Sequence, residues 1–589
     1  MPEYRMNHSI FRMNKTLRTN FILGTIIVLF CGQSAFLIVS NSAISDEVAH
    51  IVSGYDYVKN GIFDMNLEHP LLVKQWAALP LTVMKLKFPP NPERNEARDP
   101  WTIGRSFLFE LGNNADSMII TARAALLPLG IVLIVVLFLW SDRLFGPGPA
   151  LLTALLASLI PDLVVHSTFV TTDVPLAVFF FFTFYFLWRY DKFRAKSSLY
   201  AAGIVAGLAL SSKFSAILIF PMFYGYAALV SRDPAENHVS FIKRDWILPL
   251  LIFPMAVTHR LSALIFLPPF LASLFSPYLP VISQAQKVRI ALAARILLTL
   301  ISLIFLVAAV VYFNPHYWSE KFRPYKLLFR GWAIFRGHST AAEHVGFLFG
   351  EYSGKGWWYY YVIAMLVKIP VPALIAMGTG VLGVSLSKSI LVREKYFIFI
   401  PPLFFFLIAS FANTVNIGVR HILPVYPFLL LASGWFFRQI LSARPLLLKL
   451  GSLLFLFGWL SYGAYSRFPH YVSSFNELAG ICGGGDQILS DSNISWGQDL
   501  KRLRNHLEAH PVGTVRTLLQ FNTDSEMDYY GLPHMQGYDD LKQRVSGWYA
   551  MDVFTHQGLI REPEFQWLRE IKPAHKIGGS IYLFNIEAS

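Results

Sequence analysis

Long apolar runs dominate this sequence and limit what the chain can fold into. The first run covers residues 21–40, and others recur between residues 117 and 462. A helix needs about 20 apolar residues to cross a bilayer. The runs at 199–210, 246–257 and 261–275 are short for a crossing, so we expect about 11–13 transmembrane helices.

The composition supports a membrane protein. Hydrophobic residues make up 54% of the chain and charged residues 15%, whereas soluble domains contain about 25% charged residues. One soluble core cannot hide this much apolar surface, so most of it must face lipid or neighbouring helices. The sequence therefore predicts a polytopic α-helical membrane protein.

The basic residues predict how the chain is oriented. Four of them precede the first run: Arg5, Arg12, Lys15 and Arg18. A cleaved signal peptide is the alternative for this segment, but its apolar core would be only about 7–15 residues long. We expect a retained first span with a cytoplasmic N-terminus, because positive charge marks cytoplasmic loops. Segments 41–116, 314–357 and the tail then lie outside the bacterial inner membrane.

Polarity divides the chain into two expected domains. Residues 1–464 form the transmembrane domain, and residues 465–589 form a polar extracytoplasmic domain. Within the tail, residues 499–509 have helical spacing, and residues 514–521 and 580–586 alternate like strands. We therefore expect a small α/β domain after the last span.

The net charge and the cysteines exclude other classes of protein. The net charge is +13, but the basic residues lie in short loops between apolar runs, which argues against nucleic-acid binding. Contact with anionic membrane lipids explains the excess better. Cys31 and Cys482 provide neither a disulfide framework nor a metal cluster.

Two adjacent carboxylates, Asp46 and Glu47, follow the first span. Residues 48–57 then have the spacing of an amphipathic helix on the membrane surface. Asp46 can be the N-cap of this helix. It can also be a general base that takes the proton of an acceptor hydroxyl. Local sequence alone favours the cap.

Histidines beside carboxylates suggest a metal or phosphate site in the outer loops. Glu68 and His69 are adjacent, and His338 and His344 lie in the second outer segment. Carboxylate and imidazole groups bind divalent metals. The alternative is a set of solvated loop residues, because sequence distance does not show whether these side chains meet.

Charged and polar side chains at the outer ends of the spans predict a site for an anionic group. Such residues are costly near lipid and rarely persist without a function, although a helix cap or a snorkelling side chain also explains single cases. Arginine can bind phosphate oxygens bidentately. The residues concerned are Arg123, His166, Asp173, Lys213, Arg420 and His421.

The order of these motifs resembles the GT-C glycosyltransferases, in particular the bacterial relatives of protein O-mannosyltransferases and the lipid A aminoarabinose transferase. The motifs are Asp46-Glu47, Glu68-His69-Pro70, Thr172-Asp173-Val174-Pro175, Ser212-Lys213-Phe214-Ser215, Lys368-Ile369-Pro370-Val371-Pro372, Gly418-Val419-Arg420-His421, Asp491-Ser492-Asn493 and Trp496-Gly497-Gln498-Asp499. The resemblance covers the membrane region and the start of the tail. His69 and Ser495 depart from the relatives, which have Lys and Asp at these positions.

The resemblance implies a sugar donor linked to polyprenyl phosphate, transfer of a hexose or pentose, and inversion at the anomeric carbon. It implies that Asp46 is the catalytic base with Glu47 as its neighbour. Lys213 and Asp173 would line the pocket for the carrier phosphate, and Glu68 would contribute to a metal or phosphate site. The acceptor would be a protein, a lipid or a glycan.

Two other functions fit a chain of this kind. A transporter or flippase of lipid-linked sugars also needs many spans and a basic pocket. Against it, the charged residues cluster at one face, and the sequence shows no inverted repeat. A non-enzymatic scaffold for polysaccharide assembly is the third alternative.

Overall fold

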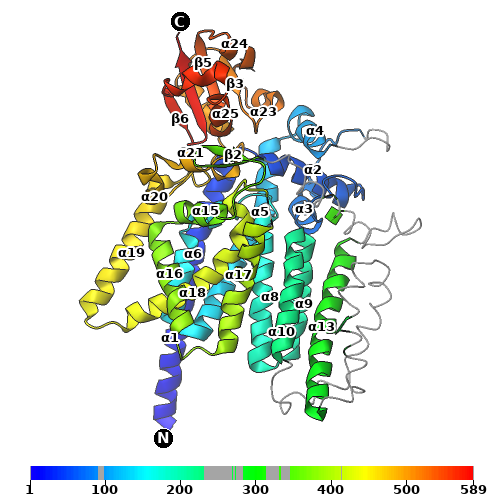
Figure 1. Ribbon diagram of the computed structural model, residues 1–589, viewed down its shortest axis with the longest axis vertical. Coiled ribbons are helices and arrows are strands. Elements are labelled where there is room, and N and C mark those ends of the chain that lie inside the picture. The colour runs from blue at the N-terminus through cyan, green and yellow to red at the C-terminus, as the bar shows by residue number, and fades with distance from the viewer. Residues whose placement is uncertain are drawn as a thin grey trace.

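A computed structural model describes residues 2–90, 99–230, 268–269, 272, 283–312, 331–332, 334, 345–412 and 414–587, and the side chains from residue 16 onward. A layer of roughly parallel helices carries a small domain at one end (Figure 1). The run expected at 246–257 lies outside the described residues, as does almost all of 261–275. The total number of spans therefore stays a prediction.

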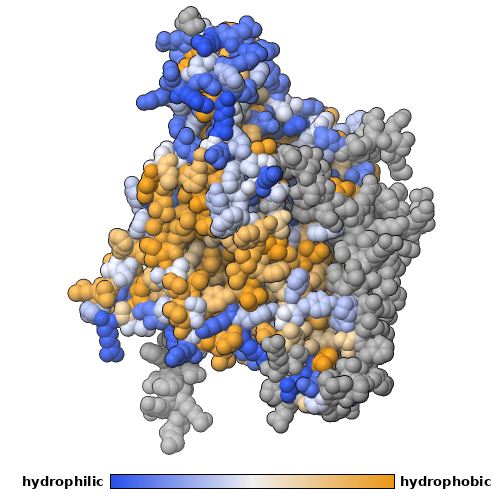
Figure 2. Space-filling view, viewed as in Figure 1, coloured by the Kyte–Doolittle hydropathy of each residue, from blue (hydrophilic) through white to orange (hydrophobic). Residues whose placement is uncertain are grey.

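The helical layer contains the apolar runs of the sequence. Five of its described helices are long and apolar enough to cross a membrane: Thr16–Ser40, Ala115–Phe145, Ala285–Val311, Val392–Phe411 and Leu446–Arg467. Figure 2 shows hydrophobic residues gathered in a broad band over this layer, with hydrophilic residues on the domain above it. The predicted class, a polytopic helical membrane protein with a C-terminal α/β domain, is confirmed.

The spans and the shorter apolar helices pack side by side in this layer (Figure 1). In chain order they are α1 (Pro2–Ser40), α5 (Ala115–Phe145), α6 (Pro147–Ser158), α8 (Asp173–Phe193), α9 (Lys196–Ser212), α10 (Ile219–Val230), α13 (Gln284–Val311), α16 (Val371–Leu386), α17 (Val392–Phe411), α18 (Tyr426–Ser442) and α19 (Leu446–Arg467).

Glycines let α9 approach α13 closely. A Cβ atom added at Gly203 would lie 2.8 Å from Leu303 Cβ, and one added at Gly207 would lie 2.6 Å from Val307 Cβ. Small residues four apart occupy one face of a helix, and they permit such contacts between membrane helices. Lys213 directly follows the last residue of α9. The contact between α9 and α13 therefore also fixes the position of Lys213 along the helix axis.

The first outer segment forms short helices between the layer and the C-terminal domain (Figure 1). They are α2 (Ser45–Lys59), α3 (Leu72–Ala78) and α4 (Pro100–Arg105). The expectation that residues 48–57 form an amphipathic surface helix is wrong, because every residue from Glu47 to Tyr57 is buried. The helix is buried because α3 and α4 pack closely against it. A Cβ atom added at Gly54 would overlap the Lys74 carbonyl, and one added at Gly104 would overlap the Val48 carbonyl.

The tail forms a five-stranded sheet in the order β4-β3-β5-β7-β6. β3 (Val515–Leu518) is parallel to β4 (His534–Gln536) and β5 (Gly547–Asp552), whereas β7 (Ile581–Ile586) is antiparallel to β5 and β6 (His575–Ile577). The strands predicted at 514–521 and 580–586 contain β3 and β7. The helix predicted at 499–509 is α22 (Leu500–Ala509).

The chain between α19 and α22 crosses the outer end of the helical layer. It contains α20 (Glu477–Ile481), α21 (Gly485–Ile488) and the short helix η9 (Asp491–Asn493). Its backbone is bonded to the start of α2: Ser45 N donates to Trp496 O at 3.0 Å, and Ser42 N donates to Gln498 O at 3.0 Å. The expected domain boundary at residue 465 stays a prediction. Residues 490–498 pack against the end of the helical layer nearest the C-terminal domain.

Candidate active site

Glu47 and Arg123 form a fully buried ion pair in the N-terminal part of α5. Arg123 Nε donates to Glu47 Oε1 at 2.8 Å and Arg123 Nη2 to Oε2 at 2.6 Å, with neither side chain exposed. The carboxylate also accepts from the backbone N–H groups of Ile44 at 3.0 Å and Val170 at 2.9 Å. Glu47 therefore holds the start of α2 against α5 and against the segment just before α8.

The remaining donors of Arg123 bind the turn before α2. They reach the carbonyl oxygens of Ile38, Asn41 and Ser42 at 2.7 to 2.9 Å. A buried charge needs this degree of pairing to be tolerated. Arg123 was predicted to bind an anionic substrate, but its donors are directed to the protein itself.

Asp46 has a different environment from its neighbour. Its carboxylate accepts from Arg420 Nη1 at 2.8 Å, and its side chain is 23% exposed. The N-cap of α2 is Ile44, and the Glu47 carboxylate bonds the Ile44 N–H. The cap alternative for Asp46 is therefore wrong, because Asp46 is not the N-cap of α2.

Four charged side chains form a chain of alternating sign at the end of the helical layer nearest the C-terminal domain. Arg420, in the short helix η8 (Val419–Val425), lies 2.8 Å from Asp46 and 3.6 Å from Asp173. Lys213, at the end of α9, lies 2.5 Å from the other oxygen of Asp173. The structure thus brings together Asp46, Asp173, Lys213 and Arg420, which were all predicted to belong to one site.

Three residues of the tail hold Arg420 in place. Ser492 Oγ accepts from Arg420 Nε at 3.1 Å, and the Trp496 ring lies under the guanidinium at 4.1 Å. Asn493 Oδ1 accepts from the N–H of Val419 at 2.9 Å. Sequence reasoning missed these roles, although the motif around Asp491-Ser492-Asn493 and Trp496 was visible, because it assigned the segment to a separate domain.

Asp491 adds a third carboxylate beside Arg420 and Asp46. Its backbone has a φ of 55°, and its carboxylate accepts from the N–H of Ser492. Burial, together with the Asp46 carboxylate, raises the pKa of Asp491 to about 6, against the lowering effect of Arg420. Asp491 was not among the predicted site residues.

Histidines line the edges of the site. His166 lies 5.9 Å from Trp496 between ring centroids, and its Nδ1 has no hydrogen-bond partner among the described residues. His421 follows Arg420 in η8. His69 meets His50 edge to face at 5.1 Å, and burial lowers the pKa of His69 well below its usual value, with His50 and Lys213 adding to the effect.

Glu68 and the buried Lys74 organise the loop before α3. Glu68 accepts from the side-chain amide of Asn66, and Lys74 Nζ donates to the carbonyl of His69 at 2.9 Å and to the Tyr57 hydroxyl at 3.1 Å. Burial lowers the pKa of Lys74 to about 7, although Glu68 opposes the shift.

The described residues contain no cluster of three or more His, Cys, Asp or Glu side chains that could hold a metal ion. The predicted ligands His338 and His344 lie outside the described residues. The metal site at Glu68 and His69 therefore stays a prediction.

A second buried ion pair, Lys368 and Asp162, ties the tail to the helices. Lys368 Nζ lies 3.7 Å from Asp162 Oδ1 and donates to the carbonyl oxygens of Val472 at 2.7 Å and Asn493 at 2.9 Å. Lys368 ends α15 (Tyr360–Lys368). The pair secures the residue next to Ser492 and so supports the position of Arg420.

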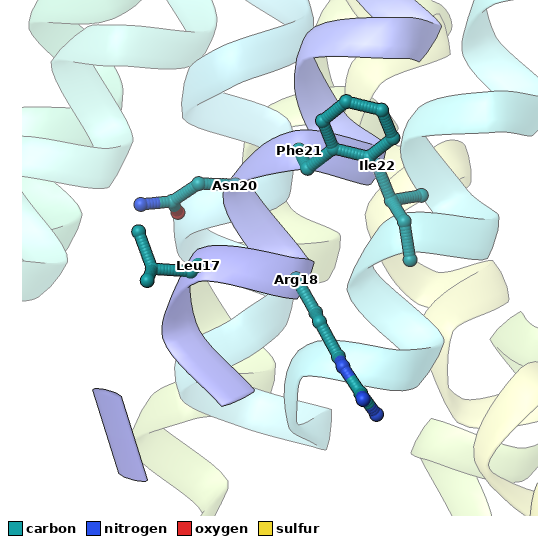
Figure 3. A pocket seen from close by; sticks show the side chains of 5 residues that line it. All are labelled: Leu17, Arg18, Asn20, Phe21 and Ile22. Carbon is teal, nitrogen blue, oxygen red and sulfur yellow. The ribbon is translucent and has the colours of Figure 1, made fainter. Parts of the chain in front are cut away.

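A hollow on the surface of α1 is not a candidate site. Figure 3 shows it lined by side chains of neighbouring turns of that helix: Leu17, Arg18, Asn20, Phe21 and Ile22. The described residues that line it belong to this one helix, and none of them is acidic. The chain of charged side chains formed by Asp46, Arg420, Asp173 and Lys213 is the better candidate for an active site, because it joins several elements.

Comparisons with known proteins agree with the predicted relationship. Residues 100–242 match the model of the family described as dolichyl-phosphate-mannose-protein mannosyltransferase, in line with the predicted resemblance to protein O-mannosyltransferases over that segment. A search of curated proteins finds no match.

Several solved structures are similar to this chain. ArnT from Cupriavidus metallidurans bound to undecaprenyl phosphate has a TM-score of 0.43 at 12% identity, over 98% of this chain and 99% of that chain. The Archaeoglobus fulgidus oligosaccharyltransferase in the apo form has a TM-score of 0.43 at 12% identity, over 91% of this chain and 69% of that one. AglB from Archaeoglobus fulgidus in complex with an inhibitory peptide and a dolichol-phosphate has a TM-score of 0.41 at 13% identity, over 97% and 75%.

Proposed function

We propose that this chain, a membrane glycosyltransferase of the GT-C class, moves a sugar from a polyprenyl-phosphate donor to an acceptor on the extracytoplasmic face, with inversion at the anomeric carbon. The observation that carries the proposal is the chain of alternating charges from Asp46 through Arg420 and Asp173 to Lys213. It combines a partly exposed carboxylate with two cations, which are the groups that this transfer requires.

Asp46 is the proposed general base. As the acceptor oxygen bonds to the anomeric carbon, its proton passes to the Asp46 carboxylate, and the bond from that carbon to the phosphate oxygen breaks. A positioned base of this kind typically contributes about 10²–10⁴ in rate. The 23% exposure of the Asp46 side chain leaves room for an acceptor hydroxyl.

Lys213 and Arg420 are the proposed phosphate-binding groups. The leaving phosphate gains negative charge as the glycosidic bond lengthens, and fixed cations stabilise that charge. Arg420 now pairs with Asp46 at 2.8 Å. A donor phosphate that takes over Arg420 would release the Asp46 carboxylate for its role as base. His166, whose ring packs near Trp496, and His421, which follows Arg420 in η8, are also proposed to contact the donor.

Glu47 and Arg123 are proposed to position the site without contacting substrate. Their buried pair fixes the turn that presents Asp46, and all polar atoms described for it are bonded to protein groups. This assignment revises the earlier expectations of a catalytic Glu47 and a substrate-binding Arg123. A divalent metal near Glu68 and His69 is retained as part of the proposal, with chelation and elemental analysis as its test.

The proposed orientation places the N-terminus in the cytoplasm and the C-terminal domain outside a bacterial inner membrane. The N-terminal end of α1 and the C-terminal domain lie at opposite ends of the helical layer (Figure 1). Cys482 is exposed in the tail. A membrane-impermeant thiol reagent should label Cys482 on intact cells and should not label a Cys482→Ser variant. Protection of Cys482 until the cells are opened would contradict this orientation.

Release of polyprenyl phosphate tests the enzyme against the flippase alternative. Purified protein in detergent, given a radiolabelled polyprenyl-phosphate sugar and cell-envelope extract as acceptor, should release the free carrier and label an acceptor. Asp46→Asn should abolish both, whereas Asp528→Asn, which removes a 75% exposed carboxylate in the tail, should not. A flippase moves its cargo without breaking it, so an intact donor would refute the proposal. The labelled acceptor would identify a protein, a lipid or a glycan.

A further inference from the structure

A cleft separates the C-terminal domain from a two-stranded hairpin that precedes α15. The hairpin consists of β1 (Gly346–Leu348) and β2 (Glu351–Ser353), which pair antiparallel, and Figure 1 shows β2 at the junction of the helical layer and the C-terminal domain. The opposite wall belongs to α25 (Val553–Leu559), which follows β5. The volume of the cleft is about 400 Å³, within the range of about 300–1,000 Å³ that is usual for ligand sites.

The cleft lies at the carboxyl ends of two parallel strands, β3 and β5. After β3 the chain leads to β4 at one side of the sheet, whereas after β5 it leads to β6 at the other side. Neighbouring loops that diverge in this way leave a crevice, and open α/β sheets bind their ligands there. Gln520, from the loop after β3, and Phe554 and Thr555, from the start of α25, line the cleft. The topology of the sheet therefore favours a ligand site at this point.

Both walls of the cleft are fixed by contacts within the protein. Asp552, a buried residue at the end of β5, accepts from the backbone N–H of Gln520 and from that of Thr555 at 2.7 Å. On the side of the hairpin, the guanidinium of Arg561 lies over the Tyr352 ring at 4.6 Å. A site whose walls are already ordered loses less conformational entropy when a ligand binds.

The side chains in the cleft combine aromatic faces with hydrogen-bonding groups. The rings belong to Tyr352 and Phe554, which are half-buried, and Gln520, Thr555 and Glu562 supply an amide, a hydroxyl and a carboxylate. A sugar offers C–H faces that pack on rings and hydroxyls that bond amides and carboxylates. Among the described residues that line the cleft, Glu562 is the charged one, so an anionic ligand fits poorly. An extended peptide would instead pair with an edge strand.

Both walls also adjoin the segments that hold Arg420. On the side of the domain, Asn522 Nδ2, in the loop after β3, donates to the carbonyl of Gly497 at 3.4 Å. Gly497 follows Trp496, whose ring lies under Arg420. On the side of the hairpin, Asn416, just before η8, accepts at 2.6 Å from the backbone that follows β2. A ligand in the cleft therefore lies next to the segments that support the candidate active site.

We propose that the cleft between the hairpin and α25 is the acceptor site and that the acceptor is a neutral glycan chain. One sugar of the chain packs on Tyr352 and Phe554, and its hydroxyls bond Gln520 and Glu562. The end of the chain extends to Asp46, which takes the proton of the hydroxyl whose oxygen bonds to the anomeric carbon. The role as acceptor rests on the proposed function, whereas binding of the glycan can be measured without it.

Equilibrium dialysis without donor tests the ligand. The probe consists of neutral oligosaccharides that are released from the native cell envelope by mild acid and labelled with a fluorophore at the reducing end. Full-length wild-type protein in detergent should retain them. The same oligosaccharides after periodate oxidation, which cleaves vicinal diols, should not be retained. Tryptic peptides of envelope proteins and phospholipid vesicles should not displace the intact probe.

Variants in the cleft test the location. Glu562→Ala should weaken binding by about tenfold or more, because hydrogen bonds to charged groups have effects of this size. Phe554→Leu keeps an apolar side chain but removes the flat ring, and should weaken binding by about threefold to tenfold. The matched control is Glu564→Ala, since the 50% exposed Glu564 carboxylate bonds Lys542 at 3.0 Å and does not line the cleft. In the transfer reaction, Glu562→Ala should raise KM for the oligosaccharide and leave KM for the donor unchanged.

The outcomes separate this inference from the proposed function. Equal retention of intact and oxidised oligosaccharides, or displacement by peptides or vesicles, would overturn the glycan as the ligand. Wild-type affinity in both cleft variants, or an equal loss in Glu564→Ala, would overturn the cleft as its site. Sugar transfer by a protein that does not bind the oligosaccharides would refute this inference and leave the transferase intact. Binding in the cleft by a protein that leaves the donor intact would support the glycan site and contradict the proposed function.

Discussion

Asp46 and Glu47 are neighbours in the chain, yet they occupy opposite environments. Glu47 is fully buried and bonded to Arg123 and to the backbone N–H groups of Ile44 and Val170. Asp46 is partly exposed and pairs with Arg420, which lies in η8 and is shared with Asp173. Consecutive residues of a helix point about 100° apart, so α2 directs one carboxylate into the protein and the other toward Arg420 and the partly exposed surface beside it.

Two adjacent residues of one helical turn are thus expected to have different roles: Glu47 stabilises the fold, and Asp46 takes part in the chemistry. A carboxylate with every lone pair occupied is a poor proton acceptor, and its removal leaves an uncompensated charge behind. A carboxylate held by one shared arginine can be released when a phosphate competes for that arginine. The two residues should therefore fail in different ways when they are altered.

The largest expected effect is on catalysis at Asp46. Asp46→Asn retains size and some hydrogen bonding but removes the proton acceptor, so kcat should fall by about 10²–10⁴. Donor affinity should change little, because Lys213 and Arg420 still hold the phosphate. Near-normal turnover by well-folded Asp46→Asn protein would break the distinction between the two carboxylates.

The next effect is on stability at Glu47. Glu47→Gln leaves the buried Arg123 without its counter-ion, and loss of one partner of a buried pair costs about 3–5 kcal/mol. Unfolding in SDS, followed by tryptophan fluorescence, should show this loss. Asp46→Asn measured in parallel should unfold close to the wild-type midpoint.

A double variant would sharpen the same point. If the two side chains act as one unit, Glu47→Gln combined with Arg123→Met should be little worse than Arg123→Met alone. Simple additivity of the two losses in free energy of unfolding would show that the pair is not the reason for the stability of this turn.

A smaller effect is expected on donor binding at Lys213. Loss of a charged hydrogen-bond donor typically costs about 1.5–3 kcal/mol, so Lys213→Ala should weaken donor binding by about 10- to 100-fold. Lys192, which is 40% exposed and pairs with Glu394, provides the matched control: Lys192→Ala should bind normally, since exposed ion pairs contribute little. Equal losses in both variants would point to general charge attraction.

The smallest effect should come from the ring below Arg420. Trp496 and Arg420 are both buried, and a desolvated cation–π contact is worth about 2 kcal/mol. Trp496→Phe keeps an aromatic face, so we expect it to lose only about 0.5–1 kcal/mol of that contact. Donor binding should fall by about twofold to fivefold. A loss as large as that of Lys213→Ala would indicate that Trp496 contacts the donor directly.

Local patterns in the sequence were sufficient for individual elements. Alternation and helical spacing predicted α22, β3 and β7, because these elements bury one face and leave the other polar. The same reasoning failed for α2, whose polar residues are buried by partners far away in the chain. A periodicity argument assumes that water covers the polar face, and here α3 and α4 cover it.

The site could be predicted only in part for a similar reason. Asp46 and Arg420 are 374 residues apart, and nothing local in either segment indicates that they meet. Their identification depended on polar residues at the expected outer ends of spans, where burial of charge is costly. That argument did not identify Asp491, because Asp491 lies in a polar segment in which an acidic residue is ordinary.

The hold of Ser492 and Trp496 on Arg420 also has a consequence for the biogenesis of the protein. A ribosome that has synthesised the chain through α19 has delivered the last transmembrane helix, Leu446–Arg467, but not the residues that fix this arginine. The nascent chain therefore passes through membrane insertion before Ser492 and Trp496 can hold Arg420 in place. Truncated chains that stop before residue 492 should therefore lack this support for Arg420.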